Sequence, residues 1–267
     1  MFSIFKQAIK EKRWTLLTYC LAGLFFVWIY VSLFPIVQGS SVNVAQLVKN
    51  LPEGVVKAFS LDPKSFTRFE GFISGKHFSL LWPIMLIGLA ISSGSAFISE
   101  EIEKKTISIL LSEPISRTKI FLGKFLAGVF NIFIFTTVSI LLIVPLAKIY
   151  GVAYTGEGFL KITIIGFVFG LSVFSLSMLF SAMFSEKGKV IFLTSGTLMA
   201  MYFANLVALL KDNLSGLKYF SFFYYFNFSE ILVHNKIDNW ALLIFLGTFL
   251  ISSSLAILLF NKRHIAE

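Results

Sequence analysis

Six long apolar runs constrain this chain more than any other feature of its sequence. A helix needs about 20 predominantly apolar residues to cross the hydrocarbon core of a bilayer. The charged side chains inside these runs, Lys124 and Lys161, lie near run ends and not in the middle. We therefore expect an all-α integral membrane protein with six transmembrane helices. The runs are Trp14–Phe34, Phe78–Ile98, Phe121–Ala147, Leu160–Phe184, Val190–Leu210 and Trp240–Phe260.

Composition supports a single membrane domain. Of the 267 residues, 57% are hydrophobic and 14% are charged, whereas soluble domains carry about 25% charged residues. Six spans use up the length, so we expect residues 1–267 to form one transmembrane domain. The first apolar run is too long for a signal peptide and has no Ala-x-Ala-like site. Cys20 is the single cysteine and excludes an internal disulfide.

The distribution of basic residues predicts the orientation in the membrane. Short cytoplasmic segments are rich in Lys and Arg, so we expect both termini in the cytoplasm of a multi-pass cell-membrane protein. Residues 35–77 and 211–239 are then external. The net charge of +9 also suggests nucleic-acid binding as an alternative function. Against it, no basic cluster with interleaved aromatics lies outside the membrane flanks. The basic flanks are Lys6, Lys10, Lys12, Arg13, Lys187, Lys189, Lys262 and Arg263.

A charged segment at residues 99–120 separates the second run from the third. A Lys, Arg or Asp at the centre of a membrane costs about 2.5–3.5 kcal/mol, so this segment must face water. Ile102, Thr106 and Leu110 fall on one helical face, Pro114 ends that helix, and Ser116 can cap the next one. This order favours a short cytoplasmic helix that docks a soluble partner over a plain solvated loop. Its acids pair with Arg117 across the hinge, or with the partner.

The same segment carries a family resemblance. The pattern Glu100-Glu101-x-Glu103-x-x-Thr106, then Leu110-Leu111-Ser112-x-Pro114-Ile115-Ser116-Arg117, then Gly123-Lys124 resembles the cytoplasmic loop of ABC-2-type ABC transporter permeases. Lys105 stands where that family usually has Gly. Phe260-x-Lys262-Arg263 is similar to the family's closing motif. The resemblance implies ATPase-coupling roles for Glu100, Glu101, Glu103, Thr106, Leu110, Leu111, Pro114, Ser116 and Arg117.

The resemblance also implies the partners. The chain would be the permease subunit of an ABC transporter, most simply an exporter, without a catalytic site or cofactor of its own. Two soluble P-loop ATPase subunits would bind ATP and Mg, and a second permease, identical or related, would complete the complex. The sequence itself has no Gly-x-x-x-x-Gly-Lys-Ser/Thr loop for nucleotide phosphates. It does not reveal the substrate.

Several smaller features have two interpretations each. Residues 1–13 form either an amphipathic elbow helix in the headgroup plane or a basic flank of the first span. We expect short external helices at 42–50 and 53–59. The aromatic residues between Tyr219 and Phe228 form a belt at the membrane surface or a substrate-exit gate. Gly166 and Gly170 permit close helix packing, within the chain or at a dimer contact.

Other functional classes fit less well. The spans lack the buried ionisable residues that ion-coupled transporters usually carry. Glu100-Glu101 is similar to the start of a CAAX-type membrane protease motif, but Lys105 replaces its Arg. We place His77 and His234 in external segments and His264 in the tail, so they do not form one metal site. A non-transporting assembly or sensory component remains the competing interpretation.

Overall fold

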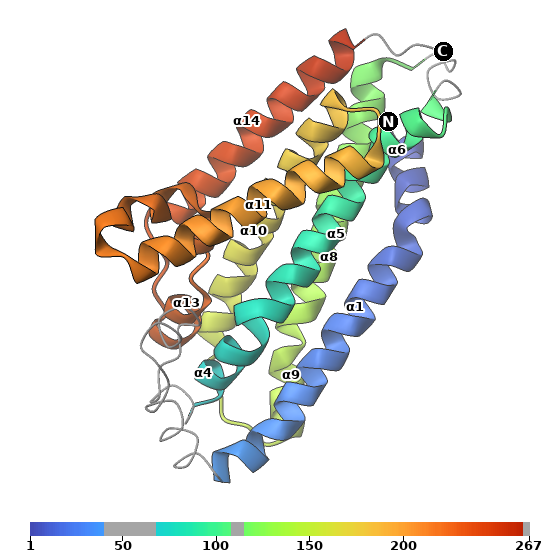
Figure 1. Cartoon of the computed structure of the whole chain (residues 1–267). Helices are drawn as coiled ribbons and strands as arrows, with labels where there is room; N and C mark the ends of the chain where they lie inside the picture. Colours follow the sequence, from blue (N-terminus) through green and yellow to red (C-terminus); the bar gives the residue numbers. More distant parts are fainter. Residues whose placement is uncertain (40–67, 108–114, 264–267) are drawn as a thin grey trace.

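The computed structural model describes residues 1–39, 68–107 and 115–263, and every regular element in those ranges is a helix. Within the described ranges, six helical stretches are long and apolar enough to cross a membrane, which confirms the predicted number of spans. Figure 1 shows Met1, the short helix α6 (Ser99–Glu103) and the C-terminal end of α14 (Ala241–Lys262) at the same end of the bundle. The spans are Phe2–Gln38, Phe69–Phe97, Arg117–Ile149, Gly156–Met183, Lys187–Leu210 and Ala241–Lys262.

The first span belongs to a single helix, α1 (Phe2–Gly39). The predicted elbow helix at residues 1–13 is therefore not a separate element. The reason lies in the sequence, because neither Gly nor Pro occurs between Phe2 and Gly23 to interrupt the hydrogen-bonded ladder. Pro35 is the proline inside this helix, close to its C-terminal end.

The second span begins earlier than its apolar run. A short helix α4 (Phe69–Ile73) leads into a π-helix, η2 (Ser74–Leu81), and then into α5 (Trp82–Phe97). His77 is consequently fully buried, with its ring centroid 5.8 Å from that of Tyr30. Placing His77 in an external loop was wrong. The residues around it are polar, but they form the π-helix η2, which packs against α1. The helices expected at 42–50 and 53–59 lie outside the described residues.

The centre of the bundle is α10 (Gly156–Met183), which packs most extensively against α14, α5 and α8 (Arg117–Leu141). After α8, helix α9 (Ile143–Ile149) completes the third span. A Cβ on Gly166 would lie 2.5 Å from the Trp82 ring, and one on Gly170 would lie 2.8 Å from Ile132. Both glycines therefore allow close approach between helices of this chain.

The aromatic segment after α11 (Lys187–Leu210) contributes to the core. It forms a 3₁₀-helix η3 (Asp212–Phe220), then α12 (Phe222–Tyr225) and α13 (Phe228–His234). Phe226 is buried and stacks on Phe169 and Trp82, with ring centroids 4.9 and 5.7 Å apart. The prediction of an interfacial aromatic belt is thus only partly correct. Tyr219 and Phe220 are exposed, whereas Phe222, Tyr225 and Phe226 are buried.

Candidate functional site

The charged segment begins with a fixed turn at the end of α5. At Ile98 the backbone leaves helical geometry, with φ −127° and ψ −61°, and α6 starts at the next residue. The Ser99 N–H donates to Ser181 Oγ at 2.9 Å, and Ser99 Oγ donates to the Ser95 carbonyl at 2.6 Å. Because Ser181 belongs to α10, the start of α6 is attached to the central helix of the bundle.

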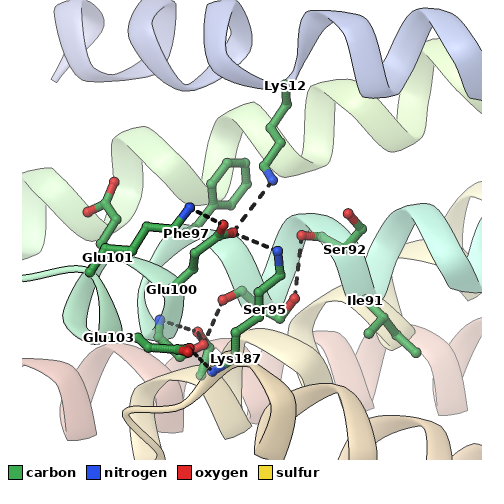
Figure 2. A network of polar contacts seen from close by, with 12 residues as sticks. Lys12, Ile91, Ser92, Ser95, Phe97, Glu100, Glu101, Glu103 and Lys187 are labelled. Atoms are coloured by element: carbon green, nitrogen blue, oxygen red, sulfur yellow. Dashed lines mark hydrogen bonds and ion pairs between the residues drawn. The ribbon is translucent and has the colours of Figure 1, made fainter. Parts of the chain in front are cut away.

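Glu100 connects three helices through one carboxylate. Its oxygens lie 2.7 Å from Lys104 Nζ, 2.9 Å from Lys187 Nζ and 4.0 Å from Lys12 Nζ (Figure 2). Burial raises the pKa of Glu100, but the hydrogen bonds from Lys104 and Lys187 outweigh it and lower the pKa to about 2. The carboxylate is therefore ionised at neutral pH and joins α1, α6 and α11. We call Lys12, Glu100, Lys104 and Lys187 the Glu100 cluster.

Glu101 pairs with a buried lysine of the next span. Lys124, on α8, is only 4% exposed and forms an ion pair with Glu101. The Lys124 ammonium also donates to the Phe97 carbonyl at 3.0 Å, at the C-terminal end of α5, where a cation is favoured. Burial raises the pKa of Glu101, and the neighbouring Lys124 opposes this. The pair attaches α6 to α8 in a largely water-free environment.

The last residue of α6 and the turn that follows it form the exposed side of this segment. Glu103 accepts a hydrogen bond of 2.8 Å from the Lys187 N–H, at the start of α11. Glu103, Lys104, Lys105 and Thr106 are exposed, unlike the half-buried Glu100 and Glu101. Lys105 has φ +57°, in the left-handed region that glycine adopts most readily. This position is the one where the ABC-2 pattern usually has Gly, so the turn is kept although the residue differs.

Arg117 lies at the start of α8 and contacts the chain end. Its Nη1 donates to the Arg263 carbonyl at 2.6 Å. The Arg263 guanidinium donates in turn to the Ala182 and Phe184 carbonyls at 2.9 and 3.2 Å, at the C-terminal end of α10. A Glu101–Arg117 pair was therefore the wrong alternative. Each residue has another partner, Lys124 for Glu101 and the main chain of Arg263 for Arg117.

The end of the bundle that carries α6 thus has two layers. Inner charges tie α6 to α1, α8 and α11, and the Ser99–Ser181 hydrogen bonds tie it to α10. Outer polar residues face away from the bundle. A family model described as ABC-2 family transporter protein matches residues 5–265. The chain belongs to this family. No curated protein matches the sequence.

As an ABC-2 family protein, the chain is a multi-pass membrane permease of the ABC transporter class. The family resemblance in the charged segment pointed to the correct class from its residues. Leu110, Leu111 and Pro114 lie outside the described residues. Ser116 precedes α8 in an extended conformation, but its side chain makes no capping hydrogen bond. Sequence reasoning did not assign Lys12, Lys124, Lys187 or Arg263 to this site, although each is a basic residue at the edge of a span.

A cavity of about 770 Å³ lies beside the inner layer of this ABC-2 permease. It lies between the N-terminal part of α1 on one side and α5 and α6 on the other. Charged side chains of α1 and α6 contribute to its wall. Its polar lining distinguishes this end of the bundle from the apolar outer faces of the spans. The lining includes Gln7, Glu11, Lys12, Glu100, Glu101 and Lys104.

Proposed function

We propose that this chain is the permease subunit of an ATP-driven ABC exporter, with α6 as the element that receives motion from a separate ATPase. The observation that carries the proposal is the double attachment of α6. The Glu100 cluster ties it to α1 and α11, while Glu101 ties it to α8. A helix held in this way passes a displacement at its outer side to several spans at once.

The proposed division of labour follows from burial. The exposed residues Glu103, Lys104, Lys105 and Thr106 form the contact surface for the ATPase. Glu100 and Glu101 act behind that surface, because their charges are already paired inside the chain. Leu110, Leu111, Pro114, Ser116 and Arg117 are assigned to coupling by the family resemblance.

The complex would contain two such permeases, identical or related, and two ATPase subunits that bind ATP and Mg. The end of the bundle with α6 and Met1 would face the cytoplasm, because soluble ATPases bind there. The basic residues at this end, including Lys12, Lys187 and Arg263, support that orientation in the cell membrane.

Co-purification with the cognate P-loop ATPase tests the proposal. Thr106→Arg places a large cation in the exposed turn that follows α6, and we expect it to weaken ATPase binding and abolish transport-linked ATP hydrolysis. Gly188→Arg is the matched control, since it adds the same side chain at the same end, where a new Cβ meets nothing within 4 Å. The pure permease alone should bind no ATP.

Two outcomes contradict the proposal. One is ATP turnover by the isolated, demonstrably pure chain. The other is equal ATPase binding and transport in wild type, Thr106→Arg and Gly188→Arg. The first result would show that the chain needs no separate ATPase, and the second would leave α6 as an ordinary connection between α5 and α8.

A further inference from the structure

A second hollow lies on the side of the bundle, between α5 and α11. It has a volume of about 450 Å³, within the range of about 300–1,000 Å³ that small-molecule sites occupy. Ile84 and Ile191 are 55% and 38% exposed, so the apolar wall is open on the outside of the helix bundle. We call this hollow the α5–α11 groove. Its lining is Ile84, Ile87, Gly88, Ile91, Ser92, Lys187, Ile191 and Ser195.

Among its lining residues, the α5–α11 groove carries a charge at one end only, and Ser92 and Ser195 are its other polar side chains. Lys187, which belongs to the Glu100 cluster, lies at that end, and isoleucines form most of the remaining wall. The groove extends along α11 from Lys187 to Ser195, which is about 12 Å at 1.5 Å per residue. This is less than half of a hydrocarbon core of about 30 Å. An occupant anchored at Lys187 would therefore reach from the membrane surface towards the midplane, as one alkyl chain does.

The charge around Lys187 favours an anionic occupant. Three lysines, Lys12, Lys104 and Lys187, share the carboxylate of Glu100. Lys12 also lies near Glu11, and Lys104 near Glu103, whose carboxylate accepts the Lys187 N–H. Glu100 would keep Lys104 at 2.7 Å and Lys12 at 4.0 Å if Lys187 turned to another anion. The cluster thus has a cation available for a ligand without leaving Glu100 unpaired. Figure 2 shows Lys187 beside Glu100, with Ile91 and Ser92 of the groove wall in the same view.

We infer that the α5–α11 groove binds a single-chain anionic amphipath, with the alkyl chain along the isoleucines and the anionic head on Lys187. Binding of the head competes with Glu100 for Lys187, so an occupied groove loosens the connection between α11 and α6. The site would thereby report its occupancy to the helix that we propose contacts the ATPase. As an assignment of substrate class, the inference rests on the proposed permease function. Binding to the groove does not rest on it.

Photolabelling of the purified full chain in neutral phosphatidylcholine nanodiscs tests the groove without any ATPase. The probes are palmitate with a diazirine on the chain, hexadecanol with the same diazirine, and a diacyl phosphatidylglycerol with the same group. We expect palmitate to label peptides from α5 and α11 that line the groove. Lys187→Gln should reduce palmitate labelling about tenfold, equivalent to about 1.4 kcal/mol, and leave hexadecanol labelling unchanged.

Two matched controls accompany these variants. Lys189→Gln removes a cation two residues away that pairs with Glu186 outside the groove, and should label as wild type. Ser195→Phe fills the groove and should block both single-chain probes. Gly196→Phe adds the same ring on the same helix, where a new Cβ meets nothing within 4 Å, and should not block them.

Several results would overturn the inference. Equal palmitate labelling in Lys187→Gln and Lys189→Gln would remove the role of the cation. Equal labelling of the groove by phosphatidylglycerol and palmitate would identify it as ordinary annular lipid contact. Cross-linking of the groove to a second copy of the chain would make it a subunit interface. Because no ATPase is present, each result is independent of the coupling experiment.

Discussion

The buried Glu101–Lys124 pair makes the sharpest prediction about how α6 is held. Removing one partner of a buried ion pair typically costs about 3–5 kcal/mol, whereas replacing both partners with apolar residues is often neutral. Lys124 is 4% exposed and the Glu101 side chain 16% exposed, so the pair belongs to this desolvated class. We therefore expect Glu101→Gln to be strongly destabilising and Glu101→Leu with Lys124→Met to recover most of the loss.

The measurement is the thermal midpoint of the purified permease in one detergent. For a chain of this size, about 1 kcal/mol corresponds to roughly 2–4 °C, so Glu101→Gln should lower the midpoint by on the order of 10 °C. The control is Glu186→Gln in the exposed pair with Lys189, where the side chains are 57% and 58% exposed. Such a surface pair contributes about 0–1 kcal/mol, so its midpoint should hardly change.

Lys124→Met tests the direction in which stability changes with pH. Burial raises the pKa of Glu101, so the folded state favours the protonated carboxyl and is penalised as the pH rises through the folded-state pKa. Without Lys124 the penalty grows, and Lys124→Met should lose less stability at pH 5 than at pH 8. The reasoning is refuted if Glu101→Gln and Glu186→Gln shift the midpoint equally, or if the double variant loses as much as both single variants together.

Three further predictions concern topology, acidity and packing. In a Cys20→Ser background, a cysteine at Gly188 should resist an impermeant thiol reagent in intact cells and one at Tyr219 should react; the reverse pattern would invert the orientation. The lowered pKa of Glu100, about 2 against an ordinary 4.5, stabilises the fold above pH 4.5, and this contribution is lost as the pH falls from 4.5 towards 2. Glu100→Gln should therefore flatten the acid side of the midpoint-against-pH curve. Gly166→Ala, whose Cβ meets Trp82 at 2.5 Å, should cost about 1–3 kcal/mol, whereas Gly247→Ala, with open space, should not; equal stability would show that Gly166 does not need its close approach.

The spans were predictable because the bilayer imposes a length and a polarity on every crossing segment. The sequence also placed the charged segment correctly between the second and third spans. The partners of its charges were not predictable in the same way. Lys124 is a basic residue near a run end by sequence, and only the packing of α8 against α5 brings it to Glu101.

The aromatic segment shows the same limit. Phe226 and Tyr219 are both aromatic residues of the same segment, so the preference of aromatics for the membrane interface applies equally to both. Their difference arises from tertiary structure, because Phe226 stacks on Phe169 and Trp82 in the core whereas Tyr219 is exposed. Lys105 is the opposite case. The family pattern expects Gly there, and the positive φ of Lys105 shows that the backbone requirement is unchanged.

The unbroken course of α1 has a consequence for the lipid environment. Its 38 residues measure about 57 Å at 1.5 Å per residue, nearly twice the thickness of a hydrocarbon core of about 30 Å. Helices adapt to thinner or thicker bilayers by changing their tilt. Because α1 has no joint between its membrane part and Lys12, a change of tilt also moves Lys12 relative to Glu100. The thickness of the bilayer therefore enters directly into the geometry of the Glu100 cluster.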